Sequence, residues 1–301
     1  MKNLFLVFAI VLSIVPGTSF AYIVNINLPD EVSNNLGLAV GPNGNVYLTT
    51  LSYGGYDNLW EFNTSGVLQN STRVPIDTGF AGNLADIDFM DNGKIISYVA
   101  VETGPSTYER YIYTYNADGS SPSQLFTLPS SMNGLSCASP GILFLSSSEP
   151  TLYQGEIKSY INLFTVDGVF ISRFLARYNK HIAGIAYDPD SESLFVTYLY
   201  TPEPFLEEYV KDENGDYKFS QAYDLSNVMV HSAMAFNFND GLFYGAWSNQ
   251  SFSVFSLDDL TKIDPPELIL SPYHGLPIPG SLVLLASGLV GLAGLRKKFR
   301  S

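Results

Sequence analysis

Residues 37–48 read Gly-Leu-Ala-Val-Gly-Pro-Asn-Gly-Asn-Val-Tyr-Leu, which is an apolar run, a tight Asn-Gly turn and a second apolar run. Short runs of β-branched and aromatic residues joined by such a turn predict a β-hairpin. The pattern returns with a period of about 49 residues, which is typical of a repeat architecture. The first strands of the five units are expected at 37–40, 86–89, 134–137, 184–187 and 235–238, and the second strands at 45–48, 94–97, 142–145, 194–197 and 242–244.

A third strand follows in every unit, and a hairpin after it leads toward a fourth. The third strands are expected at 59–62, 112–115, 161–164, 208–210 and 252–255. Four strands per repeat and no long helical period predict an all-β chain folded as a β-propeller of five four-stranded blades. Six blades are the alternative, if residues 260–271 build a sheet of their own. The Gly-apolar-Ala and Asn-Gly rhythm of the units resembles that of NHL-type propeller repeats.

The segment at residues 22–29 lies before the first repeat and has the pattern of a fourth strand. It resembles residues 124–129 and 169–172, which occupy fourth-strand positions in their units. We therefore expect it to be the outer strand of the last blade, where it would close the ring and remove an exposed sheet edge.

The N-terminus has the pattern of a signal peptide. Lys2 supplies a positive charge, residues 4–15 form an apolar core, and Ser19 and Ala21 are small residues at the expected cleavage site. We expect residues 1–21 to be removed by cleavage between Ala21 and Tyr22. The folded part, residues 22–270, would then lie outside the cytoplasm.

The C-terminus has the pattern of a membrane anchor. Residues 281–295 carry no charge and are followed by Arg-Lys-Lys-Phe-Arg. An apolar segment with a basic end predicts a transmembrane helix at 280–295 and a cytoplasmic tail at 296–301. Residues 271–279, with Pro277 and Pro279, would form the stalk between the propeller and the membrane.

The whole tail resembles the PEP-CTERM sorting signal of Gram-negative bacteria. Pro277 and Pro279 match its Pro-x-Pro box, and residues 282–294 match its short apolar span. Ile278 departs from the commonest pattern, which has glutamate at that position. The resemblance implies inner-membrane anchoring, recognition by an exosortase-type enzyme, processing to the cell surface, and a link to exopolysaccharide or biofilm matrix. The basic end of the signal is matched by Arg296, Lys297, Lys298 and Arg300.

The charge of the chain excludes one class of partner. All 29 acidic residues but only ten of the 15 basic residues lie between the two apolar ends, so this part has a formal charge of −19. Such a surface repels nucleic acid and anionic lipid. It is compatible with neutral glycans and divalent cations. The single cysteine, Cys137, allows no intramolecular disulfide, so a large apolar core must hold the fold.

A candidate ligand site comes from the residues that precede each first strand, because such residues surround one axis in a propeller. A polar ring at this mouth could hold a sugar or a divalent cation such as calcium. The alternative is that these side chains only cap strand ends. The ring would consist of Asn34, Asn83, Ser131, His181 and His231.

The remaining chemistry-bearing residues give no definite catalytic or metal site. Asp86 and Asp88 lie on one face of a strand, where they could serve a hydrolase or a structural role. The acidic runs 188–192 and 212–216 resemble calcium loops, but they fall at expected hairpin turns. Two functions remain open. One is a non-enzymatic binding or matrix protein, and the other is a propeller hydrolase or lyase, active on lactones or glycans, that uses the polar ring.

Removing residues 277–301 should release the protein from the membrane, because the apolar span is the only strong lipid anchor that the sequence predicts. Fractionation of cells that express the full-length and the truncated chain measures this. A truncated protein that has lost its signal peptide and still sediments with the membrane would contradict the expectation.

Overall fold

The computed structural model describes most of the predicted propeller. The described residues are 23–30, 32, 35–50, 56–75, 82–104, 107–129, 132–138, 141–150, 157–178, 180–198, 204–228, 230, 233–247 and 251–264. Within these ranges no helix is long and apolar enough to cross a membrane. The predicted signal peptide, stalk, transmembrane helix and basic tail lie outside the described residues.

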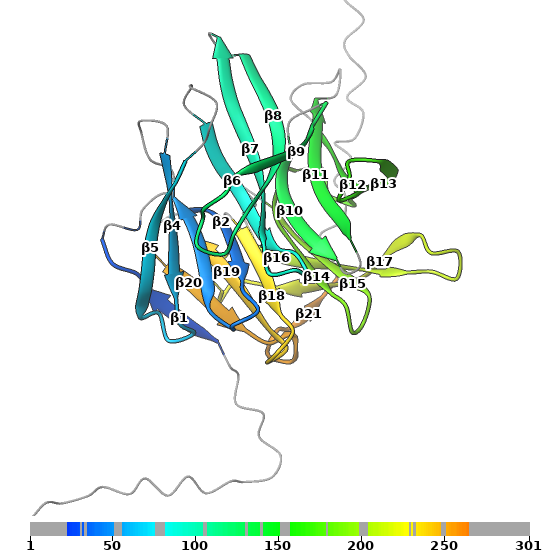
Figure 1. The fold of residues 1–301 in the computed structure, drawn as a ribbon. Coiled ribbons are helices and arrows are strands. Elements are labelled where there is room, and N and C mark those ends of the chain that lie inside the picture. The colour runs from blue at the N-terminus through cyan, green and yellow to red at the C-terminus, as the bar shows by residue number, and fades with distance from the viewer. Residues whose placement is uncertain are drawn as a thin grey trace, which may run out of the picture. The chain divides into compact units, whose positions relative to one another are not determined.

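Five antiparallel sheets follow one another along the chain, as the repeat predicts (Figure 1). Blade 1 contains β2 (Asn35–Val40), β3 (Val46–Thr50), β4 (Tyr56–Phe62) and β5 (Leu68–Pro75). Blade 2 contains β6 (Gly82–Phe89), β7 (Ile95–Gly104), β8 (Thr107–Tyr115) and β9 (Ser123–Thr127). Blade 3 contains β10 (Met132–Ala138), β11 (Ile142–Pro150), β12 (Ile157–Thr165) and β13 (Phe170–Leu175).

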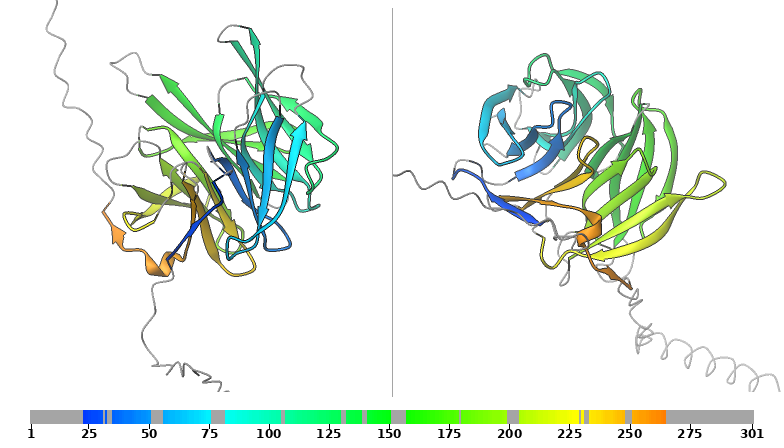
Figure 2. Two further views of the ribbon diagram at one scale, coloured as in Figure 1. Left: turned by 90° about the vertical axis from the view of Figure 1, so that its left-hand side faces the viewer. Right: turned by 90° about the horizontal axis from the view of Figure 1, so that it is seen from below.

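The last two blades use chain segments from outside their own repeat. Blade 4 contains β14 (Ile182–Asp188), β15 (Ser193–Tyr198), β16 (Phe205–Lys211) and β17 (Tyr217–Asp224), and its outer edge carries β21 (Lys262–Ile263). Blade 5 contains β18 (Ala233–Asn237), β19 (Leu242–Trp247), β20 (Ser251–Phe255) and β1 (Val24–Asn27). The first strands β2, β6, β10, β14 and β18 contact one another in a closed cycle, so the five blades stand around a common centre (Figure 2).

The ring closes through the two ends of the repeat region. β1 pairs antiparallel with β20, from Val24 opposite Val254 to Asn27 opposite Ser251. The Ser253 hydroxyl and the Asn25 side-chain oxygen lie 2.5 Å apart across this pair. The prediction that the first segment is the outer strand of the last blade is therefore confirmed.

The segment after blade 5 decides between five and six blades. A short 3-10 helix, η1 (Leu257–Asp259), follows β20, and β21 then pairs with Ala222 and Tyr223 of β17. Through Asp264, where the described residues end, this segment extends blade 4 and builds no separate sheet. The five-blade prediction is confirmed.

The tight turns between the first and second strands explain the Asn-Gly signal of the repeat. Gly44, Gly93, Gly141 and Gly241 occupy these turns with φ between 71° and 78°. Residues other than glycine rarely adopt this conformation. Blade 4 lacks the glycine, and Glu192 adopts a φ of 52° in its turn instead.

In blades 1 and 4, the first strand approaches the next blade too closely for a side chain at the repeat's glycine position. A Cβ atom on Gly37 would lie 2.7 Å from the Asp86 Cα atom of blade 2. A Cβ atom on Gly184 would lie 2.7 Å from the Met234 backbone nitrogen of blade 5. These glycines therefore allow the backbones of neighbouring blades to meet.

Two aspartates of β6 join blade 2 to blade 3. The Leu135 N–H donates to Asp86 Oδ2 over 2.7 Å, and the Cys137 N–H donates to Asp88 Oδ2 over 2.7 Å. Asp86 is almost completely buried and also receives the Ile87 N–H at 3.0 Å. Because both carboxylates accept backbone N–H groups from the neighbouring blade, they act as polar clasps between blades.

Other blade boundaries use similar side-chain clasps. Buried Asp57 of blade 1 accepts the N–H of Leu84 in blade 2. Between blades 3 and 4, the Tyr209 hydroxyl accepts the Arg177 N–H at 2.8 Å and donates to Glu207 at 2.6 Å. Burial raises the pKa of Glu207, as expected for a carboxyl group in the core.

Apolar and aromatic side chains fill the space between the blades. The rings of Phe195 in blade 4 and Phe243 in blade 5 lie 4.7 Å apart, and those of Phe144 in blade 3 and Tyr187 in blade 4 lie 5.4 Å apart. Aromatic pairs at these distances add to the stability gained by burial. No disulfide is needed, which agrees with the single cysteine.

The clasps make the stability of the propeller depend on pH. Burial raises the pKa of Asp88 from 3.8 to about 6, and burial also raises the pKa of Asp86. Groups with a raised folded-state pKa stabilise most when protonated, and this contribution is lost as the pH rises through the folded pKa. The free energy of unfolding should therefore fall by about 2 kcal/mol between pH 4 and pH 6 through Asp88 alone.

Urea unfolding across this pH range, followed by tryptophan fluorescence, checks the expectation. Asp88→Asn should reduce the slope of the unfolding free energy against pH, whereas Asp216→Asn, at an exposed hairpin, should not. A wild-type stability that rises over this range would show that the buried carboxyl groups do not have raised pKa values.

Candidate functional site

The propeller has two mouths, which we name by the chain direction of the first strands. The entry mouth is the end where the chain enters each first strand. The turn mouth is the opposite end, where each first strand turns into the second. The predicted polar ring belongs to the entry mouth. Asn34, Ser131 and His231 lie outside the described residues, and Asn83 is placed only through its backbone, opposite Ala100.

His181 is the member of the predicted ring whose side chain the structure describes. It is exposed, and its Nδ1 atom lies 3.0 Å from Ser148 Oγ of blade 3. Ser148 Oγ lies 3.4 Å from Ser159 Oγ, which donates to the Lys180 carbonyl over 2.5 Å. His181 is thus held against the neighbouring blade by a serine. The described residues do not test whether the five predicted side chains converge.

The turn mouth contains a hollow of about 250 Å³ that the sequence analysis did not predict. Its walls come from the ends of three first strands and the turns that follow them. Blades 1, 2 and 5 each contribute a wall. The lining residues are Val40, Gly41, Pro42, Phe89, Met90, Asp91, Phe236, Asn237, Phe238 and Asn239.

Aromatic rings form the apolar part of this lining, and their neighbours fix them in place. Phe89 packs edge-on against Tyr47, with ring centroids 4.9 Å apart. Phe236 packs against Phe243 at 4.9 Å and against Phe238 at 5.8 Å. Phe238 is 58% exposed. A ligand could therefore cover its ring without any rearrangement of the core.

The polar part of the lining is organised by hydrogen bonds within the turns. Asn237 is buried, and its Nδ2 atom donates to Asp240 Oδ2 over 2.8 Å. Tyr244 donates to the same oxygen at 3.1 Å. Asn239 and Asp91 are exposed at the rim and contribute a carboxamide and a carboxylate. The hollow thus combines fixed aromatic rings with hydrogen-bonding groups, as ligand sites usually do.

A second polar cluster flanks the hollow on blade 1. Glu61 Oε1 accepts hydrogen bonds from Asn45 Nδ2 at 2.7 Å, from the Tyr47 hydroxyl at 2.9 Å and from Asn43 Nδ2 at 3.1 Å. Burial and the bond to Glu61 raise the pKa of Tyr47 to about 12. The cluster holds Tyr47, and through its ring Phe89, in a fixed position.

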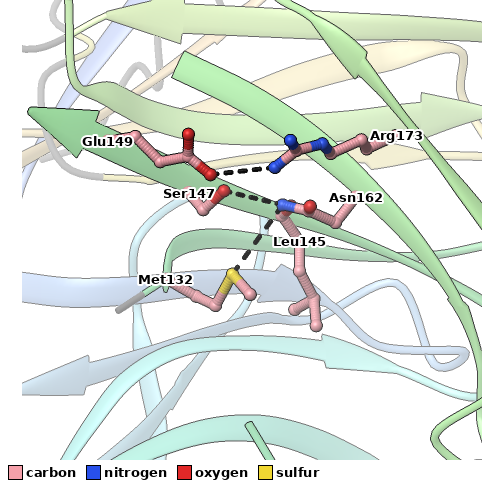
Figure 3. A network of polar contacts seen from close by, with 6 residues as sticks. All are labelled: Met132, Leu145, Ser147, Glu149, Asn162 and Arg173. Carbon is pink, nitrogen blue, oxygen red and sulfur yellow. Dashed lines mark hydrogen bonds and ion pairs between the residues drawn. The ribbon is translucent and has the colours of Figure 1, made fainter. Parts of the chain in front are cut away.

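A third polar cluster, on blade 3, is satisfied by its own members (Figure 3). Buried Asn162 donates from Nδ2 to Ser147 Oγ at 2.8 Å and to the Leu145 carbonyl at 3.1 Å. Arg173 Nη1 lies 2.8 Å from Glu149 Oε1 beside it. These groups bind one another and stabilise blade 3, so we do not consider them a ligand site.

The acidic runs that resemble calcium loops are hairpin turns. Asp212 Oδ1 accepts the N–H groups of Asn214 at 2.8 Å and Asp216 at 3.0 Å. Asp188 accepts the Asp190 N–H at 2.9 Å and the Ser191 hydroxyl at 2.6 Å. Across the described ranges, no three His, Cys, Asp or Glu side chains gather in a way that could hold a metal ion.

Other sequence candidates have structural roles. Asp86 and Asp88 are inter-blade clasps, and burial raises the pKa of the Cys137 thiol well above its usual range. Tyr98, Tyr113 and Tyr115 of blade 2 are buried in the core.

A weak sequence signal for the turn mouth existed in the aligned repeats. The fourth position of the predicted first strands is Phe89 in blade 2 and Phe238 in blade 5. Strand aromatics are usually core residues, so the pattern alone could not show that these two rings face a hollow. Only the ring closure brings blade 5 beside blades 1 and 2.

Comparisons with known proteins identify no family for this chain. No protein-family model and no curated protein matches this chain. Among solved structures, a nidogen/laminin complex is similar at 17% identity with a TM-score of 0.49, covering 77% of this chain and 79% of that chain. A putative oxidoreductase (glucose dehydrogenase) from Thermus thermophilus has 12% identity and a TM-score of 0.48, covering 77% of this chain and 99% of that chain.

A gluconolactonase from Xanthomonas campestris is also similar, at 14% identity with a TM-score of 0.46 over 77% of this chain and 74% of that chain. The number of blades follows from this chain's own strand order, and the candidate site follows from its own side chains.

Proposed function

We propose that this chain is an exported, membrane-anchored binding protein whose propeller holds a sugar ring at its turn mouth. The observation that carries the proposal is the hollow of about 250 Å³, lined by Phe89, Phe236 and Phe238 together with Asn239 and Asp91. Its size is near the lower end of the range for ligand pockets, which suits a ligand of one or two rings.

The chemistry of the lining fits a carbohydrate. A sugar ring has an apolar face of C–H groups that can stack on an aromatic ring, and a rim of hydroxyl groups that needs hydrogen-bond partners. Phe238 offers an exposed ring, and Asn239 offers both a donor and an acceptor at the rim. A purely apolar ligand would leave these polar groups without partners, which costs free energy.

The proposed location follows from the two chain ends. The signal-peptide pattern at residues 1–21 and the resemblance of the tail to a PEP-CTERM signal support a propeller outside the cytoplasm. In this proposal an exosortase-type enzyme recognises the tail, and the binding partner is a polysaccharide of the cell surface or biofilm matrix. The acidic charge of the chain, −14 overall, argues against nucleic acid as a partner.

A second candidate function is hydrolysis at the entry mouth, and one observation favours it. Ser148 Oγ and His181 Nδ1 lie within hydrogen-bond distance, as a serine nucleophile and its base must. Removal of the hydroxyl proton by His181 would allow Ser148 to attack an ester or lactone carbonyl. The ester C–O bond would then break, with the acyl group on Ser148 and the proton of His181 passing to the departing alkoxide oxygen. Water, deprotonated by His181, would attack the acyl-serine, release the acid and leave the proton to return to Ser148 Oγ.

The hydrolase candidate predicts covalent labelling of one residue. A fluorophosphonate probe should label Ser148 in the full-length protein, and His181→Ala should lower the labelling rate by about two orders of magnitude, because it removes the base. Mass spectrometry of the tryptic peptides locates the label. Ser71, exposed on β5, serves as the reference serine. Equal labelling of Ser148 and Ser71 would eliminate this function.

The binding proposal predicts that Phe238→Ala weakens sugar binding at least about tenfold, which corresponds to about 1.4 kcal/mol. Isothermal titration of the full-length protein in detergent with neutral and amino-sugar oligosaccharides measures this. Phe170→Ala on β13 is the matched control, because Phe170 is 51% exposed and belongs to blade 3, which does not line the hollow. Wild-type affinity in Phe238→Ala, or equal losses in both variants, would contradict a site at the turn mouth.

A further inference from the structure

We infer that the turn-mouth hollow selects a sugar that carries a positive charge, namely a hexosamine with a free ammonium group. This inference rests on the proposed carbohydrate function and names the ligand class of the same site. The groups that carry it are the three phenylalanine rings of the lining and the carboxylate of Asp91.

The arrangement of the rings favours a cation. Phe89 approaches the hollow from blade 2, whereas Phe236 and Phe238 approach it from blade 5. Phe236 and Phe238 meet at an interplanar angle of 70°, so the pair presents both a ring face and a ring edge. An ammonium group over a ring face is attracted by the negative potential there, and several rings around one cation form the common cage for such ligands.

The charged residues around the hollow also favour a cationic ligand. Among the described residues, its lining contains one carboxylate, Asp91, and no lysine, arginine or histidine. The nearest basic residue in sequence is Lys94, which is exposed in the same turn and does not line the hollow. A carboxylate can accept several hydrogen bonds, so Asp91 can receive an ammonium group in addition to the interaction that it already makes.

The surroundings extend this negative field beyond Asp91. Burial raises the pKa of the Cys137 thiol, and the charges of Asp88 and Asp91 raise it further. Asp240 lies in the neighbouring turn, where it receives Asn237 and Tyr244. A uronic acid would meet repulsion from these groups, and an N-acetylated sugar would gain nothing from them.

The test compares three oligosaccharides of the same length on the full-length protein in detergent. These are an oligomer of glucosamine with free amines, its N-acetylated counterpart, and an oligogalacturonate. At pH 6 the free-amine oligomer should bind at least about tenfold more tightly than the N-acetylated one, and the uronate should bind more weakly than both. Raising the pH to 9 deprotonates the amines and should remove this preference.

Variants separate a specific site from general attraction to an acidic protein. Asp91→Asn should abolish the preference, so that the free-amine and N-acetylated oligomers bind with similar affinity. Asp216→Asn removes one exposed carboxylate of a hairpin in blade 4 and should retain the preference. Phe238→Ala should weaken the binding of both oligomers.

The outcomes distinguish this inference from the function on which it rests. If no oligosaccharide binds, the carbohydrate function itself is wrong. If the free-amine and N-acetylated oligomers bind equally to the wild type, the sugar site stands and the charge selection is refuted. If Asp216→Asn reduces the preference as much as Asp91→Asn, the attraction belongs to the whole surface and the inference is also refuted.

Discussion

The pairing of β1 with β20 is the interaction on which the rest of the structure depends. It joins residues 24–27 to residues 251–254, so that the first described strand completes the last blade. Without this pair β20 would be an open sheet edge, and blade 5 would lack its outer strand. With the pair in place, β18 contacts both β14 and β2, and every blade packs between two neighbours.

Ring closure also forces the first strands of neighbouring blades into close backbone contact at the centre. The described residues of these strands belong to different sheets, so they do not pair through backbone hydrogen bonds. Glycine at positions 37 and 184 gives them room. The polar groups that this contact buries are satisfied by side chains, among them Asp57, Asp86 and Asp88. These carboxylates therefore serve the fold. In the sequence, Asp86 and Asp88 resemble a pair of catalytic acids, because two carboxyl groups on one face of a strand also occur in active sites.

The candidate site is a product of the same closure. The turn-mouth hollow needs walls from blades 1, 2 and 5, and blade 5 reaches blades 1 and 2 only in the closed ring. Tyr47, which donates to Glu61, packs against Phe89, and Phe243 packs against Phe236. Rings that are already packed lose little freedom when a ligand binds, which lowers the entropy cost of binding.

The sequence alone determined the class of fold, the five repeats and the role of the first segment, because strand periodicity, Asn-Gly turns and a repeat are local patterns, whereas the choice between five and six blades needed the pairing of β21. It also yielded His181 as a candidate, but its partner Ser148 is 33 residues away and was not predicted. The tertiary structure decided that Asp86 and Asp88 are clasps and that β21 joins blade 4. It also decided that Phe89 and Phe238 face one hollow. The physical reason is that side-chain surroundings depend on contacts between distant blades, which no periodicity within a single blade can specify.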